Sequence, residues 1–323
     1  MRKTLFSLLA GGLLGLLVWP AAAEPRAGED RSLGAAEREV LRLMDAGRRV
    51  NFAGKQLVTL VFGRRRAQAS VAVWQYDGWL RTEVLSPGPM KGRVVLERGR
   101  HRFEKRAGDT EWQPRPGGAP PSPWRMLRNY KVRVVGSAPI AGLPTTILEV
   151  KNRRTDTLAR KFWVDKTKGV VLRTEVYNWA GLLMSSVEFQ EIDYGARLCK
   201  SDFEVPEALL APPPPDGLPE DAPEVPRPRY VPEGYVLAGP PSGVRTDRGA
   251  AVHFRYSDGL NAISVFVRKL KPGEPRPPHW GRFPGPFSGA VQRVKGDYRV
   301  TVIGDLDPAE LARMAESAAP EGR

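Results

Sequence analysis

The sequence is that of a basic chain of 323 residues with a formal net charge of +14 and a single cysteine. One cysteine excludes an intramolecular disulfide. Beyond the N-terminal region, no segment approaches the roughly 20 apolar residues that a membrane-spanning helix needs.

The N-terminus has the three parts of a secretory signal peptide. Arg2 and Lys3 supply positive charge, residues 5–19 are apolar, and residues 21–23 are alanines that suit signal peptidase. We therefore expect cleavage of residues 1–23 and a periplasmic mature chain. An uncleaved anchor is the alternative. Export also removes nucleic acid from the expected partners.

Strand patterns dominate residues 24–205, the first expected domain. Apolar side chains at helical spacing predict a helix at 35–50, and a second, short helix is predicted at 123–130. Residues 109–123 are rich in Pro and Gly, which predicts a loop. The expected strands are 57–62, 69–76, 79–85, 93–97, 101–105, 131–135, 145–150, 160–165, 170–177 and 184–192.

These strands follow one another without regular intervening helices, which favours an antiparallel meander. A sheet of this many strands curls to close or cover itself. We therefore expect an α+β protein, mostly antiparallel β, with a large curved half-barrel and covering helices.

A proline-dense segment separates this domain from a smaller one. Residues 206–232 hold ten prolines, and we interpret 206–229 as a stiff linker. The domain at 230–323 is expected to contain strands at 250–256, 261–269, 289–294 and 297–304, then a helix at 307–318. Asp307 suits its N-cap and Pro308 its first turn, with Leu311, Met314 and Ala315 as its apolar face.

The excess positive charge lies in the first domain. Residues 24–205 contain 33 basic and 21 acidic residues, whereas residues 206–323 contain 15 of each. The densest cluster is Arg64, Arg65 and Arg66, a candidate contact for lipid headgroups, lipopolysaccharide or acidic proteins. A solvated hairpin loop is the alternative for these arginines.

Residues for catalysis or metal binding form no recognisable pattern. The three histidines lie apart, without a second ligand at metal-binding spacing. No nucleophile elbow, phosphate loop or dinucleotide motif occurs. We expect no catalytic residue, metal or cofactor, and a non-enzymatic protein. Cys199 is interpreted as a buried free thiol, with an intermolecular bridge as the alternative.

Aromatic residues are concentrated in the first expected sheet. Trp74, Trp79 and Trp163 are candidate lining for an apolar groove that holds acyl chains. Packing within the core is the favoured alternative, because aromatic residues suit strands.

The second domain contains a turn that enters a strand, at residues 256–267. Asp258 and Gly259 form a turn signal because Gly accepts a positive φ. The alternating Ile263, Val265 and Val267 then predict a half-buried strand. Asp258, Gly259 and Leu260 are candidate partner contacts, with a purely architectural role as the favoured alternative.

Four segments resemble the MucB/RseB family of periplasmic regulators of the sigma-E envelope-stress pathway. The most specific runs from Ser257 to Val267, SDGLNAISVFV, and resembles the family's "sDGLasvSVF" pattern. The others are 50–55, 141–144 together with 162–165, and 231–235. The proline-rich linker and Ala53, where Arg or Gln is common, depart from the family pattern.

The resemblance implies a fold and a function for each domain. The large domain would resemble the LolA/LppX-type half-barrel, which holds lipid-modified ligands. The small domain would bind the periplasmic segment of a membrane-spanning anti-sigma factor of the RseA/MucA kind and shield it from proteolysis. A lipid or lipopolysaccharide signal would release it. A LolA-type lipoprotein or lipid carrier is the second hypothesis, and an envelope hydrolase is the third.

Overall fold

The computed structural model describes two compact units. The first comprises residues 34–177 and 181–210, and the second comprises 225–319 together with 178–180. Within these ranges, residues 39–48, 100, 116–122, 247–248 and 275–288 are not described. The expected signal peptide, most of the helix expected at 35–50, and linker residues 211–224 lie outside the described residues.

The first unit is a single antiparallel sheet with short helical segments. Residues 35–38 are helical, and the other helical segments described are α3 (Pro123–Asn129), the 3-10 turn η2 (Lys200–Phe203) and α4 (Glu207–Leu210). Its strands are β1 (Phe52–Phe62), β2 (Arg65–Tyr76), β3 (Trp79–Val84), β4 (Val94–Arg98), β5 (His101–Lys105), β6 (Gln113–Arg115), β7 (Tyr130–Ile140), β8 (Leu143–Asn152), β9 (Leu158–Asp165), β10 (Val171–Tyr177) and β11 (Leu183–Asp193).

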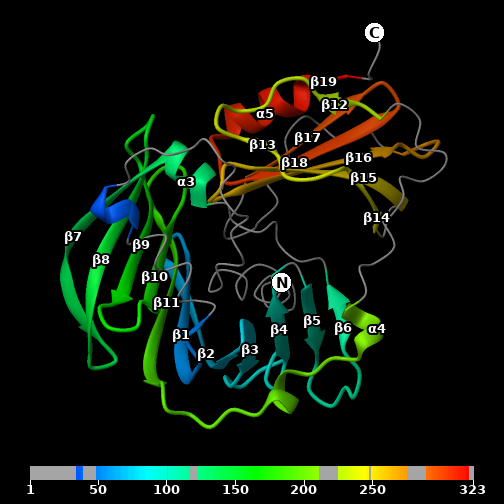
Figure 1. The fold of residues 1–323 in the computed structure, drawn as a ribbon. Helices are drawn as coiled ribbons and strands as arrows, with labels where there is room; N and C mark the ends of the chain where they lie inside the picture. Colours follow the sequence, from blue (N-terminus) through cyan, green and yellow to red (C-terminus); the bar gives the residue numbers. More distant parts are fainter. Residues whose placement is uncertain are drawn as a thin grey trace, which may run out of the picture. The chain divides into compact units, whose positions relative to one another are not determined.

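The strand order of this sheet is β6-β5-β4-β3-β2-β1-β11-β10-β9-β8-β7. The chain therefore makes two meanders that meet where β1 pairs with β11. The sheet is strongly curved from β7 to β6 (Figure 1). Its two edges, β6 and β7, remain unpaired by any described strand.

Each strand predicted in the first unit is present, but several of them begin or end at other residues than predicted. The segment expected as a loop at 109–123 contains the short strand β6. β7 extends to Ile140, five residues beyond the predicted end. Both segments belong to the edge strands β6 and β7, where many side chains are exposed. The alternation of apolar and polar residues that predicts a strand is therefore missing there.

Each face of the sheet carries an apolar cluster. The first face, defined by Phe52, Val73, Leu80 and Phe189, is buried. Phe52 and Phe189 meet edge to face, with their ring centroids 5.6 Å apart. On the second face, Leu96 and Phe103 pack with Phe203. The segment that contains η2 and α4 runs from β11 past the neighbouring strands to the β6 edge (Figure 1).

The second unit is a sheet covered by one helix. Its elements are β12 (Arg227–Pro228), β13 (Val236–Leu237), β14 (Ser242–Thr246), β15 (Gly249–Ser257), β16 (Ala262–Lys269), β17 (Gly289–Lys295), β18 (Tyr298–Gly304), α5 (Pro308–Glu316) and β19 (Ala318–Ala319). The order is β13-β15-β16-β18-β17, and β14 also pairs with β15. β12 and β19 form a separate two-stranded ladder.

The helix α5 forms where the sequence predicts it. The Asp307 side chain accepts a hydrogen bond from the Ala309 backbone N–H at 2.8 Å, and Pro308 lies at the start. Leu311, Met314 and Ala315 are fully buried against the sheet. The N-cap, the proline and the apolar stripe all favour one helix.

The predicted fold class, mostly antiparallel β with few helices, is confirmed. A large curved antiparallel sheet is followed along the chain by a smaller, separate sheet-and-helix unit. Short strands β13 and β14 enlarge the second sheet beyond the four strands predicted.

Candidate functional site

The turn between β15 and β16 is held by its own side chains. The buried Asp258 carboxylate accepts hydrogen bonds from the backbone N–H groups of Leu260 at 2.8 Å and Asn261 at 2.6 Å. Gly259 has φ +99°, a conformation that L side chains rarely adopt. Asp258 and Gly259 thus build the turn, while Leu260 is partly exposed.

A short exposed strand lies beside this turn. In β13, Val236 pairs with Ser257 and Leu237 pairs with Tyr256, directly before Asp258. Val236 is 45% exposed and Leu237 is 43% exposed, although both are apolar. The sequence analysis missed these two residues because a strand of two residues gives no periodicity. The nearest sequence signal is the apolar pair directly after Gly234 and Tyr235.

The face of the second sheet opposite α5 carries a mixed group of side chains. His253 stacks on Phe266, with the ring centroids 4.4 Å apart and the planes within 7°. The paired strands place Ser264 beside Arg255 and Thr301 beside Phe266 on this face. Burial, assisted by the charge of Arg255, lowers the pKa of His253 to about 4. The imidazole is therefore neutral at pH 7.

This lowered pKa predicts acid destabilisation of the second unit. Between pH 6.5, the ordinary pKa of histidine, and the lower folded value, His253 is protonated in the unfolded chain but not in the native state. The free energy of unfolding therefore falls as the pH falls through this range. The expected loss is on the order of 2 kcal/mol, reduced by solvent around a half-buried ring. His253→Phe keeps the stack and should flatten this loss, measured by hydrogen exchange across the window. An equal loss in the variant would contradict the assignment to His253.

Two arginines that pair across β16 and β18, Arg268 and Arg299, share one carboxylate partner. The Glu274 carboxylate accepts hydrogen bonds from Arg268 and lies 3.1 Å from Arg299 Nη1. Hydrogen bonding to Arg268 lowers the pKa of Glu274 to about 2. Both guanidinium groups are buried, so the carboxylate fixes their position.

The three candidate tryptophans occupy two places in the first unit. Trp74 and Trp79 pack on the Leu96–Phe103–Phe203 cluster, and Arg81 lies 4.6 Å from the centre of the Trp74 ring. Trp163 belongs to the other cluster, which includes Ile140 and Val170. The structure therefore brings Trp74 and Trp79 together and places Trp163 apart. A ligand contact for these rings stays a prediction.

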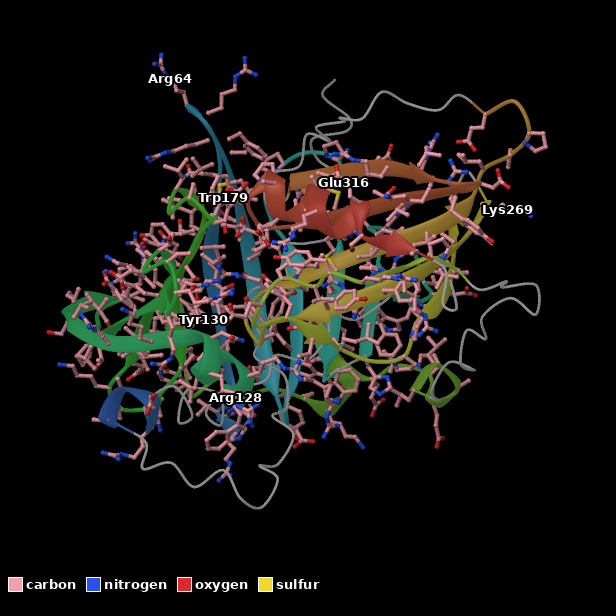
Figure 2. All side chains as sticks on the ribbon, turned by 90° about the horizontal axis from the view of Figure 1, so that it is seen from above. Arg64, Arg128, Tyr130, Trp179, Lys269 and Glu316 are labelled. Atoms are coloured by element: carbon pink, nitrogen blue, oxygen red, sulfur yellow. The ribbon has the colours of Figure 1, made fainter. Side chains whose placement is uncertain are left out.

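The three candidate arginines lie at the tip of the β1–β2 hairpin. Arg64 is in the turn, and Arg65 and Arg66 begin β2. All three are exposed. Figure 2 shows Arg64 at the end of the hairpin, with its side chain directed away from the ribbon.

A charged cluster on the first face of the large sheet was not predicted. Arg102 Nη1 donates to Glu97 Oε1 at 2.6 Å, and Arg93 pairs with Glu104. These side chains are largely buried, and burial raises the pKa of Glu97 despite the Arg102 charge. Charged residues at alternate strand positions normally indicate a solvated face. The signal that could have revealed the pair is the Glu97–Arg102 register of the hairpin.

Cys199 is exposed, which corrects the expectation of a buried thiol. It precedes η2, in the segment that leaves the sheet after β11, where its side chain meets solvent. Within the described ranges, no cluster of three or more His, Cys, Asp or Glu is arranged to hold a metal ion. No helix in the described part of the chain is long and apolar enough to cross a membrane.

Two family models match the chain. The MucB/RseB N-terminal domain matches residues 96–209, and the MucB/RseB C-terminal domain matches residues 227–319. Together they cover well over half of the sequence. The chain belongs to the MucB/RseB family.

Relatives of this MucB/RseB protein extend the match over the whole chain. The sigma factor AlgU regulatory protein MucB of Pseudomonas aeruginosa is 25% identical over 341 residues, covering 99% of this chain and 98% of that protein. A MucA/MucB complex of Pseudomonas aeruginosa has a TM-score of 0.68 at 19% identity, over 90% of this chain and 100% of that one. MucB in complex with MucA(peri) has a TM-score of 0.62 at 21% identity, over 89% and 100%.

Proposed function

We propose that this MucB/RseB protein is a non-catalytic periplasmic regulator that binds the periplasmic segment of an anti-sigma factor. Bound there, it protects that segment from proteolysis. The family match over both units is the observation that supports this proposal most strongly. Similar proteins solved with MucA, or with its part named MucA(peri), give the class of partner.

The second unit offers an apolar surface for such a partner. Val236 and Leu237 lie in an edge strand whose outer side no described strand pairs, beside the partly exposed Leu260. Exposed apolar groups beside free backbone hydrogen-bonding groups suit an extended peptide. We assign β13 and the adjoining turn as the contact, with Asp258 and Gly259 acting through the shape of the turn.

Charges placed in β13 are expected to disrupt capture of the partner. Val236→Asp with Leu237→Asp would bury two carboxylates in the interface, which should weaken affinity by about 3 kcal/mol or more, at least 100-fold. The measurement is titration of a purified anti-sigma periplasmic segment into the mature protein. Protection of that segment from proteolysis should fall in parallel.

A matched control lies in the first unit. Val134 and Val135 in β7 are 55% and 47% exposed, so Val134→Asp with Val135→Asp also replaces two neighbouring apolar side chains by carboxylates at similar exposure. This control should retain wild-type affinity. Equal loss in both double variants would contradict the assignment to β13, and unchanged affinity in both would do so as well.

We also propose that the first unit binds a lipid that acts as a signal. The curved sheet has an apolar cluster on its first face, and buried polar atoms there, Gln56 Oε1, Thr82 Oγ1 and Ser185 Oγ, have no described hydrogen-bond partner. Such atoms suit a bound amphiphile or water. Mass spectrometry of an organic extract of the purified protein tests this point, and the LolA-type carrier hypothesis shares it.

A further inference from the structure

The hairpin of β1 and β2 ends in three arginines, Arg64–Arg66, referred to below as the arginine tip. Each is exposed and makes no ion pair with another described residue. A Cβ added to the neighbouring Gly63 would meet no atom within 4 Å, so the turn stands in open space. Figure 2 shows the hairpin reaching beyond its neighbours to Arg64.

Many other basic side chains of the first unit have carboxylate partners, in contrast to the arginine tip. On the sheet surface, cation and carboxylate are 2.5 Å apart in Lys55–Glu191, 2.7 Å in Lys131–Asp156 and 2.9 Å in Lys161–Glu149. Arg173 bridges Glu175 and Glu188. The tip therefore brings together three consecutive exposed cations that have no described carboxylate partner.

The segments of the first unit that form this end of the sheet contain no acidic residues. No Asp or Glu occurs from residue 51 to 76, which covers both strands of the hairpin. None occurs from 176 to 187, which covers the turn into β11. Because Leu60 pairs with Ser185, that turn lies at the same end of the sheet as the tip. These segments of the first unit therefore contribute positive charge near the tip and no negative charge.

The tip protrudes beyond the rest of the sheet. β3 pairs with β2 only from Val71 to Tyr76, and β11 reaches only Leu60 of β1. Within the protruding part, Val61 pairs with Arg66 and Phe62 pairs with Arg65, and both apolar residues are partly exposed. Leu182, in the turn before β11, is 63% exposed. A cationic projection with apolar residues beside it suits the interface of a membrane.

We propose that the arginine tip docks the protein onto the surface of an anionic phospholipid membrane. The tip is convex, and no described group faces the three guanidinium groups to form a second wall, so it fits a planar, diffuse negative charge better than one enclosed carboxylate or phosphate. Leu182 adds an apolar contact at headgroup depth. This binding is independent of the anti-sigma partner and would hold the regulator close to a membrane.

Co-sedimentation of the mature protein with phosphatidylglycerol–phosphatidylcholine vesicles tests the proposal. Each basic residue near an anionic surface contributes about 1 kcal/mol, so Arg64→Gln, Arg65→Gln and Arg66→Gln together should weaken binding by about 100-fold. Binding should also fall between about 0.01 M and about 0.15 M salt, as the Debye length shrinks from about 30 Å to about 8 Å. Pure phosphatidylcholine vesicles should not bind.

Two further variants separate the tip from net charge and from a specific anion site. Lys55→Gln, Lys131→Gln and Lys161→Gln remove the same charge at paired positions and should weaken binding much less. Replacing all three tip arginines by Lys should retain binding, because a diffuse surface does not require guanidinium geometry. Equal loss in the paired-lysine variant, or loss in the Arg→Lys variant, would overturn the proposal, as would vesicle binding unchanged by the Arg→Gln variant.

Discussion

Arg102→Met is expected to destabilise the first unit by about 3–5 kcal/mol at neutral pH, because it leaves a buried carboxylate without its partner. Arg102 Nη1 lies 2.6 Å from Glu97 Oε1, and both side chains are largely buried. The effect should appear in amide hydrogen exchange of β3 to β5, measured by mass spectrometry so that each unit is followed separately.

The pH dependence of this variant follows from the raised pKa of Glu97. Between the unfolded value of 4.5 and the higher folded value, the native state holds a proton that the unfolded chain releases. Stability therefore rises as pH falls through that window. Loss of Arg102 raises the folded pKa further, so the deficit of Arg102→Met should shrink in acid.

A neighbouring exposed pair supplies the control for Arg102→Met. Arg98 lies 3.6 Å from Asp77, and both side chains are at least half exposed. Arg98→Met should cost less than about 1 kcal/mol. Combining Glu97→Leu with Arg102→Met should recover most of the lost stability. A deficit that stays the same in the double variant would show that Glu97 is not the cause.

Leu311→Ala is expected to destabilise the second unit by about 3–5 kcal/mol, because it removes a fully buried side chain and leaves a cavity. Leu311 lies against glycines of the sheet: a Cβ on Gly289 would come within 2.8 Å of Leu311 Cδ1. This close fit leaves few neighbours able to fill the space. Amides of β15 to β18 should exchange faster.

The effect of Leu311→Ala should stay within the second unit. Amides of β8 to β11 should keep their protection, because the units have separate cores. Leu306→Ala makes the same change at a partly buried position and should cost less than half as much. Faster exchange of the same size in both units would contradict the independence of the two cores.

The sequence predicts regular elements better than the sites at their margins. Ile263, Val265 and Val267 alternate and are buried as expected, and the Asp307–Pro308 pair correctly starts α5. β6 and β13 were missed because strands of two or three residues at an edge carry no period.

The buried charges were missed for a different physical reason. In β4 and β5, Glu97 and Arg102 occupy alternate positions that normally meet water, but their pairing across the hairpin permits burial. The turn between β15 and β16 was recognised from Asp258 and Gly259. Its exposed neighbours Val236 and Leu237 belong to a strand about 20 residues earlier in the sequence. Only the three-dimensional pairing brings them together.

Calorimetric titration of the mature protein with the periplasmic segment of a membrane-spanning anti-sigma factor tests the central claim most directly. The account predicts saturable binding that Val236→Asp with Leu237→Asp weakens and that Val134→Asp with Val135→Asp leaves intact. If hydrogen exchange shows that both units are folded and the titration still shows no binding to that segment, the proposal that this protein acts by binding an anti-sigma factor is contradicted.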